Sequence, residues 1–241
     1  MHLVLFCGGD HIYGDGLPKP LYRSSSGDSL LSIYSSTSVY VNSETVTLLV
    51  ENRSKAAFSK DVTRLGKSKP LSLVVCPDGS TTLEKLLVYL RNESSPEGPT
   101  IFSYPDIFYF GDINVLDSVD LDKSIVLTSR SAVSRFPRLY VEPYGTAVRS
   151  ISAQNKNVRT NNVLMFGGHL IAKPSFLEHY LESRQEAILS RGGKLEVEGF
   201  SSFIGDGVAK HIELRGKWMQ VDGPRDLAEL AQALEETTEP N

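Results

Sequence analysis

Over its first 112 residues the chain alternates short apolar runs with segments of helical periodicity. Strands are predicted at 2–7, 46–52, 71–77 and 106–112. Helices are expected between them, at 29–40, 54–65 and 80–92. Helical segments of this length serve as crossovers, which parallel strands need because each strand begins at the same end of the sheet. The order therefore predicts an α/β fold with a mostly parallel sheet and helices on both of its faces.

After Asp112 the pattern changes to strands with few helices between them. Strands are predicted within 124–130, 138–152, 161–172, 194–200 and 211–216. One long helix is expected at 173–193, with a proline in its first turn and two glycines at its end. A last helix follows Asp222. We interpret this part as a smaller mixed or antiparallel section. No repeat or low-complexity linker divides the chain, so residues 1–241 are predicted to form a single domain.

The composition argues against several classes of partner. The net charge is −4, and the lysines and arginines are scattered along the 241 residues, which disfavours nucleic acid or an anionic membrane as a partner. No apolar stretch approaches the roughly 20 residues of a membrane span, and no signal peptide is recognisable, so we expect a cytoplasmic protein. Cys7 and Cys76 end two predicted strands, and neither has a second cysteine or histidine at ligand spacing. They are predicted to be buried, reduced thiols.

The segment CGGDHIYGDGLPKPLY, residues 7–22, directly follows the first predicted strand. In an open α/β sheet, ligands bind beyond the carboxyl ends of the parallel strands, where this loop is expected to lie. Gly8 and Gly9 allow backbone amides to approach a ligand. Pro18 and Pro20 restrict the backbone on both sides of Lys19, which limits where its ammonium group can reach. We interpret the loop as a phosphate site; a turn that binds nothing is the alternative.

Two aspartates are predicted at the same edge of the sheet. Asp112 closes the predicted strand 106–112, and Asp222 stands directly before the last helix. Each of them alone is explained as a turn or capping residue. Together they offer two hard oxygen ligands, which suits Mg²⁺ held by one or two carboxylates and by substrate phosphates.

The order of these motifs resembles that of the sugar-1-phosphate nucleotidyltransferases, which couple a nucleoside triphosphate to a sugar 1-phosphate or a similar phosphorylated small molecule. The matching stretches are VLFCGG, LPKPL, the GD at 111–112 and WMQVDGPRDL. The resemblance extends from Leu3 to Leu234 and implies a single-domain, Rossmann-like nucleotide-diphospho-sugar transferase fold. It assigns nucleotide binding to residues 1–112, acceptor binding to 113–222, and a C-terminal helix and tail to 223–241.

Further stretches extend the resemblance to individual site residues. CPDGSTTLEKLL falls where the family has a Gly-Thr pair before a helix, which implies that Gly79 and Ser80 lie against the base. EPYGTAVRSI resembles the family's Tyr-Gly stretch and places Gly145 near the sugar. Lys156 in SAQNKNV matches the lysine that approaches the sugar phosphate, and Gly168 in LMFGGHLIA belongs to the family's Thr-Gly strand. The resemblance implies that Gly145, Lys156 and Gly168 bind the acceptor.

The glycine-rich loop departs from the family pattern. The family reads Gly-x-Gly-Thr-Arg or Gly-x-Gly-Ser-Arg, and this chain has Gly8, Gly9, Asp10, His11 and Ile12 at those positions. In the family, the arginine neutralises the triphosphate as pyrophosphate leaves. Ile12 therefore puts catalysis, and not the fold, in question. His11 and Arg23 are the candidates to replace the missing charge, while Lys19 is retained.

The resemblance implies that a phosphate oxygen of the acceptor attacks the α-phosphorus of the triphosphate in line and expels pyrophosphate. Asp112 and Asp222 would hold Mg²⁺. Lys19, with His11, would engage phosphate oxygens, and Lys156 would receive the acceptor's phosphate. The first hypothesis is an active enzyme of sugar nucleotide biosynthesis. The alternatives are a nucleotide or nucleotide-sugar binder without turnover and a glycosyltransferase of the related fold. The base and the acceptor are not determined, and a homo-oligomer is left open.

Overall fold

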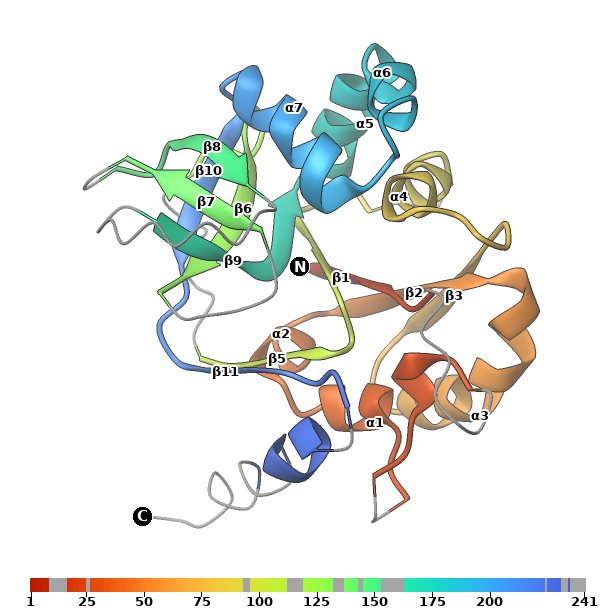
Figure 1. Cartoon of the computed structure of the whole chain (residues 1–241). Coiled ribbons are helices and arrows are strands. Elements are labelled where there is room, and N and C mark those ends of the chain that lie inside the picture. The colour runs from red at the N-terminus through yellow and green to blue at the C-terminus, as the bar shows by residue number, and fades with distance from the viewer. Residues whose placement is uncertain are drawn as a thin grey trace.

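The computed structural model describes residues 1–8, 17–24, 27–92, 96–111, 119–131, 137–142, 145–152, 163–223, 225–230 and 234. These residues form one sheet of nine strands with helices on both faces, and a separate two-stranded ribbon packs beside it (Figure 1). The main path through the sheet runs β10-β6-β9-β4-β1-β2-β3, and β7 and β8 extend it from β9. The predicted α/β fold, with a mostly parallel central sheet and an added antiparallel part, is confirmed.

The parallel half of the sheet is built around β1 (His2–Phe6), whose residues are all buried. Its parallel partners are β2 (Thr45–Glu51) and β4 (Thr100–Ser103), and β3 (Leu71–Cys76) follows beyond β2. Successive side chains of β1 point to opposite faces of the sheet. Leu3 and Leu5 accordingly enter one apolar core, and Val4 and Phe6 enter the other. From Leu3 to Phe6 the strand is apolar, as expected for a strand that is covered on both faces.

The helices of this half divide between the two faces. They are α1 (Leu30–Tyr34), α2 (Ser38–Val41), α3 (Lys55–Leu65) and α4 (Thr82–Leu90). The first three pack on the core that contains Leu3, and α4 packs on the other. The predicted start of α4 is confirmed, because Thr81 and Glu84 each accept a hydrogen bond from the other's backbone amide. The predicted helix 29–40 is two short helices, since the Thr37 side chain caps a second start.

The predicted strand 106–112 is not part of the main sheet. The strand beside β1 is β4, six residues earlier, and β5 (Ile107–Phe110) pairs antiparallel with β11 (Lys217–Gln220) in the separate ribbon. Two apolar runs stand on either side of Tyr104-Pro105-Asp106, and Pro105 has no amide hydrogen to continue a ladder. The sequence prediction read only the second, more apolar run as the strand. This placement was wrong by one strand.

The second half of the sheet is mixed, as predicted. Its strands are β6 (Ile125–Arg130), β7 (Arg138–Val141), β8 (Val148–Ser152), β9 (Val163–Ala172) and β10 (Ala209–Glu213). The long strand β9 runs antiparallel to β4, β6 and β7, while β10 is parallel to β6. Because β4 and β6 are both antiparallel to β9, their carboxyl ends lie at the same edge of the sheet.

Two predictions for residues 173–200 are wrong. The expected long helix is divided into α5 (Pro174–Glu182) and α6 (Gln185–Leu189). The expected strand 194–200 is a π-helical turn, Leu195–Gly199, that leads into α7 (Phe200–Gly205). Its alternating sequence imitates a strand, yet the amides of residues 197, 198 and 199 all donate to the Lys194 carbonyl. Glu196 in this turn accepts hydrogen bonds from Thr82 and Tyr104, which are distant in sequence.

The predictions about the two cysteines and about membrane spans can be compared with the structure. Cys7 and Cys76 are free and buried, as predicted, and burial raises the pKa of the Cys76 thiol to about 11. In the described part of the chain, no helix has the length and apolar character needed to cross a membrane.

His169 on β9 gives the fold a predictable response to acid. It is fully buried, its Nδ1 lies 2.8 Å from Ser103 Oγ, and burial lowers its pKa from 6.5 to about 4. The folded protein therefore takes up this proton later than the unfolded chain as the pH falls. The contribution of neutral His169 to the free energy of unfolding is fully present above pH 6.5 and is lost as the pH falls from 6.5 to 4. The free energy of unfolding should fall by on the order of 3 kcal/mol over this range.

Urea unfolding at pH 7, 6, 5 and 4 would measure this loss, and His169→Phe should show a shallower decline over the same range. His179, whose side chain is 86% exposed, provides the matched control variant His179→Phe, which should follow the wild type. An equally steep decline in His169→Phe would contradict the assignment.

Candidate functional site

Lys19 stands at the carboxyl edge of the parallel strands. Pro18, Lys19, Pro20 and Leu21 form a single 3-10 turn, with Pro20 and Leu21 buried. The amides of Leu21 and Tyr22 bond to the carbonyls of Pro18 and Lys19. The predicted restraint of Lys19 by its two flanking prolines thus takes the form of a short helical turn whose apolar side is anchored in the core.

The ammonium group of Lys19 joins two carboxylates. Its Nζ lies 2.5 Å from Asp106 Oδ2 and 3.1 Å from Asp222 Oδ1, and the three side chains are 14%, 19% and 25% exposed. The two carboxylate oxygens therefore lie within the sum of those distances of each other. Residues from the start, the middle and the end of the chain meet at this point.

The ribbon of β5 and β11 brings the two aspartates together. Ile107 pairs with Gln220, so Asp106 and Asp222 are near neighbours at the same end of the ribbon. The amide of Val221 bonds to the carbonyl of Asp106. Residues 225–230 are helical, and the Asp226 carboxylate accepts hydrogen bonds from the amides of Asp222 and Gly223, at 2.7 and 3.0 Å. The last helix thereby fixes the backbone that carries Asp222.

Asp106 was missed by the sequence prediction, which chose Asp112. The signal was available, because Pro105-Asp106 directly follows the strand beside β1. From Asp106, β5 leads the chain away, and Gly111 is five residues on, roughly 16 Å at the rise of a strand. Asp112 itself lies outside the described residues, so its predicted role stays a prediction. The structure brings together Lys19, Asp222 and an aspartate that the sequence prediction had placed at the start of a strand.

A divalent cation fits the donor set formed by Asp106 and Asp222. Two converging carboxylates match the way Mg²⁺ binds, with one or two protein carboxylates and the remaining ligands from water and substrate phosphates. No group of three or more acidic, histidine or cysteine side chains suited to a metal occurs among the described residues.

A cavity of about 140 Å³ opens beside Lys19. Its lining includes Phe6, Gly8, Pro18, Lys19, Tyr104 and Asp106. Phe6 and Tyr104 stack with their ring centroids 5.3 Å apart. Burial raises the pKa of Tyr104 well above its ordinary value, the neighbouring Glu196 carboxylate raises it further, and the Tyr104 hydroxyl donates to that carboxylate. One wall of the cavity is thus apolar and the other is charged.

A buried ion pair lies beneath Gly8. Lys85 Nζ is 2.9 Å from Glu51 Oε1, and both side chains are 3% exposed. A Cβ on Gly8 would lie 2.8 Å from that Nζ, so only glycine fits without moving the pair. Burial alone would raise the pKa of Glu51, but hydrogen bonds from Lys85 and the Gly79 amide outweigh it and lower that pKa. The pair thereby links the loop after β1 to the loop that contains Gly79.

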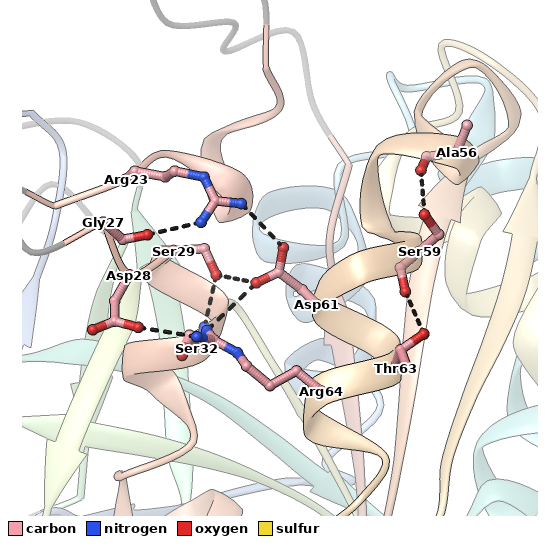
Figure 2. A network of polar contacts seen from close by, with 10 residues as sticks. All are labelled: Arg23, Gly27, Asp28, Ser29, Ser32, Ala56, Ser59, Asp61, Thr63 and Arg64. Atoms are coloured by element: carbon pink, nitrogen blue, oxygen red, sulfur yellow. Dashed lines mark hydrogen bonds and ion pairs between the residues drawn. The ribbon is translucent and has the colours of Figure 1, made fainter.

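Arg23 is committed to a different network. Figure 2 shows its guanidinium between the Gly27 carbonyl, at 2.7 Å, and the Asp61 carboxylate, at 3.8 Å. Asp61 on α3 is 3% exposed and also accepts from Ser29 and pairs with Arg64. These contacts tie the chain that follows Lys19 to α3. Arg23 is therefore occupied as an anchor in this structure, which disfavours it as the substitute for the missing arginine.

Comparisons with solved structures decide the fold. One solved structure, from Bacillus anthracis, is described as a glucose-1-phosphate thymidylyltransferase. It superposes with a TM-score of 0.74 at 12% sequence identity, and the match covers 100% of this chain and 96% of the other. The fold is that of the nucleotidyltransferases. The inositol-1-phosphate CTP transferase from T. maritima gives 0.70 at 16% identity, covering 99% of this chain and 98% of its own. A nucleoside-diphosphate-sugar pyrophosphorylase from Vibrio cholerae gives a TM-score of 0.68 at 16% identity, and the match covers 96% of this chain and 100% of the other. No family model and no curated protein matches this sequence.

The remaining predicted residues have different positions in this nucleotidyltransferase fold. Gly79 and Ser80 lie in the loop before α4 and line a second, more open cavity of about 540 Å³. Gly145 accepts a hydrogen bond at its carbonyl from His211, at 3.1 Å, if Nε2 carries the proton. Gly168, at φ +94°, backs directly onto Ile107, where a Cβ would collide at 2.3 Å. Gly9, His11 and Lys156 lie outside the described residues, as does the departure from the family at Ile12.

Proposed function

We propose that the protein is a nucleotidyltransferase that couples a nucleoside triphosphate to a sugar 1-phosphate or a similar phosphorylated small molecule and releases pyrophosphate. The observation that carries the proposal is Lys19 bridging Asp106 and Asp222 at the carboxyl edge of a nucleotidyltransferase fold. Three solved structures of this fold are described as a glucose-1-phosphate thymidylyltransferase, an inositol-1-phosphate CTP transferase and a nucleoside-diphosphate-sugar pyrophosphorylase. The fold supports many chemistries, so the site and not the fold decides the assignment.

The reaction needs positioning and charge more than it needs a base. The acceptor's phosphate oxygen is already anionic, so no residue has to remove a proton from it. We assign Asp106 and Asp222 to hold Mg²⁺, which when bound would neutralise charge on the α-phosphate. Lys19 is placed to donate to phosphate oxygens at the same point. The apolar wall of the cavity excludes water on the side of Phe6 and Tyr104.

Nucleotide and acceptor are assigned to opposite parts of the edge. Gly8, with Gly9, and the loop of Gly79 and Ser80 are proposed to receive the triphosphate and the base. Gly145 and Lys156 are proposed to receive the acceptor, whereas Gly168, to which the resemblance gave the same role, is proposed to act only through packing. Because burial closes Gly168 against Ile107, its proposed contribution is to allow β9 and β5 to approach each other closely and not to touch the acceptor.

The loss of the family arginine at Ile12 supports a second candidate. A protein that binds nucleotide or nucleotide sugar without turnover would need the same fold and the same glycines but no charge clamp. Since Arg23 is held by Gly27 and Asp61, His11 is the remaining candidate to supply that charge. A glycosyltransferase of the related fold is disfavoured, because a donor that is already formed does not require Lys19.

The decisive experiment measures pyrophosphate release. Each of the four nucleoside triphosphates is mixed with Mg²⁺ and a panel of sugar 1-phosphates, and binding is followed in parallel by thermal shift. Pyrophosphate release that depends on an acceptor is the expected result. Binding of a triphosphate without release with any acceptor would replace the enzyme with the silent binder. Release of free nucleoside diphosphate from a nucleotide sugar would instead support a glycosyltransferase.

A further inference from the structure

Arg130, the last residue of β6, has no carboxylate partner among the residues that the structure describes. Its guanidinium lies over the Trp218 ring, 4.0 Å from the ring centre, and Trp218 Nε1 donates to the Gly167 carbonyl at 2.8 Å. In the part of the chain that the structure describes, Nε and Nη1 of Arg130 are buried and have no hydrogen-bond partner. Burial lowers the pKa of this arginine. Buried donors of a charged group that are left unsatisfied are costly, so proteins rarely keep them without a use.

The register of the sheet places Arg130 at the same edge as Asp106. Leu170 of β9 pairs with Phe102 of β4 on one side and with Leu127 of β6 on the other. Counted from that common level, Arg130 lies three residues toward this edge, and β4 ends one residue toward it, at Ser103, before the turn that carries Asp106. Only β9 separates β4 from β6, so these two strands run roughly 10 Å apart. Arg130 therefore stands at the same edge of the sheet as the turn that carries Asp106, on the side proposed to receive the acceptor.

A second arginine emerges beside it. Met165 of β9 pairs with Arg130 of β6 and with Arg138 of β7, and directly opposed residues share one face of a sheet. The two arginines thus flank Met165 on the same face. On the far side, Arg138 pairs with Ser152, the last residue of β8. This row of side chains ends where the chain leads on toward Lys156.

The stacking on Trp218 fixes the orientation of Arg130. Trp218 is itself anchored by its bond to Gly167, so the guanidinium plane is held in one place before any ligand arrives. A planar, fixed guanidinium is suited to carboxylate and phosphate groups, which it can bind through two parallel hydrogen bonds. The residue as a whole is partly exposed, while Nε and Nη1 themselves are buried, so a ligand that uses the fork must displace what covers these two atoms.

We infer that Arg130 binds a second acidic group of the acceptor, separate from the phosphate that is coupled to the nucleotide. This inference rests on the proposed function and narrows its substrate class to phosphorylated sugars or polyols that carry a further carboxylate or phosphate. No bond is made or broken at Arg130; it holds the acceptor through charge-assisted hydrogen bonds.

Three matched ligands test the inference: glucose 1-phosphate, glucuronic acid 1-phosphate and glucose 1,6-bisphosphate. Their affinities are measured by titration calorimetry at constant ionic strength, and their turnover is measured by pyrophosphate release. Glucuronic acid 1-phosphate and glucose 1,6-bisphosphate each carry a second acidic group, and at least one of them should bind wild type about tenfold or more tightly than glucose 1-phosphate. The one that binds more tightly shows whether the site prefers a carboxylate or a phosphate. Arg130→Gln should remove that preference. Arg149→Gln, a change of equal charge at an exposed position of β8, should keep it.

Equal affinity of wild type for the three ligands, or a preference that Arg130→Gln leaves intact, overturns the inference while acceptor-dependent pyrophosphate release still supports the enzyme. A preference that depends on Arg130 without any turnover keeps the anion site and removes the proposed reaction. If no sugar phosphate binds, inorganic phosphate is titrated instead, and equal affinity in wild type and Arg130→Gln overturns the inference. Should Arg130→Gln fail to fold, Arg130→Lys takes its place and should lose most of the preference, because an ammonium group lacks the fork.

Discussion

Lys19→Ala is expected to lower the rate of pyrophosphate release by a factor on the order of 10²–10³. The ammonium group of Lys19 lies at the point where Asp106 and Asp222 converge, with its side chain largely shielded from solvent. A charged donor at this point acts on the charge that develops on the phosphates. Since Ile12 stands where the resemblance places an arginine, we expect this donor to carry more of the neutralisation in the proposed reaction. The measurement is kcat/KM at saturating Mg²⁺.

Three companion variants make this result interpretable. Lys19→Arg should recover only part of the rate, because a planar fork does not reproduce a point charge. Lys123→Ala, at a position that is 83% exposed, should leave the rate unchanged. His11→Ala identifies the substitute for the missing arginine if it causes a large loss. A wild-type rate and wild-type nucleotide affinity in Lys19→Ala would show that the loop is only a turn.

Asp106→Asn should reduce pyrophosphate release by a similar factor or more, and Asp222→Asn should do the same. Each change keeps the shape of the side chain and removes one of two negative charges that are proposed to hold the metal. Lys19 keeps one carboxylate partner in each variant, so neither change leaves its largely shielded ammonium group without a counterion. The rate is measured across a range of Mg²⁺ concentrations, because weakened metal binding shifts the midpoint to higher concentration.

Asp112→Asn is the matched comparison, since the sequence pointed to that residue. A loss in Asp106→Asn together with little change in Asp112→Asn would establish the pair seen in the structure. The reverse pattern would return the metal site to Asp112 and Asp222. Unchanged rates and unchanged Mg²⁺ dependence in all three variants would remove the metal-site proposal altogether.

The strands β1, β2 and β3 could be located from sequence because their signals are local. A fully apolar run, a capping box at Thr81 and Glu84, and crossover lengths typical of parallel strands each depend on neighbouring residues only. The position of Lys19 at the carboxyl edge of the parallel strands could be predicted because it lies in the loop that follows β1. Lys19 could be recognised because its two prolines are adjacent to it in the chain.

The position of Asp106 depends on partners that are distant in sequence. Whether TIFS or IFYF enters the main sheet is decided by pairing with β1 and β11, and neither pairing is visible in either run alone. The π-helical turn at Leu195–Gly199 is similarly decided by contacts from Thr82 and Tyr104. Arg130 carries no motif at all. Only the register of β6 against β9 places it at this edge of the sheet.

The ion pair between Lys19 and Asp222 joins residues that are 203 positions apart, and it has a consequence for synthesis on the ribosome. Lys19 emerges early, and Asp222 emerges only after β11 and just before the helix that anchors it. A nascent chain can therefore form most of the parallel sheet while its site still lacks one of the two carboxylates. Such a chain cannot yet hold the pair, whatever else has folded. Contacts this distant in sequence also form late, so we expect the carboxylate pair to assemble after the parallel strands have paired.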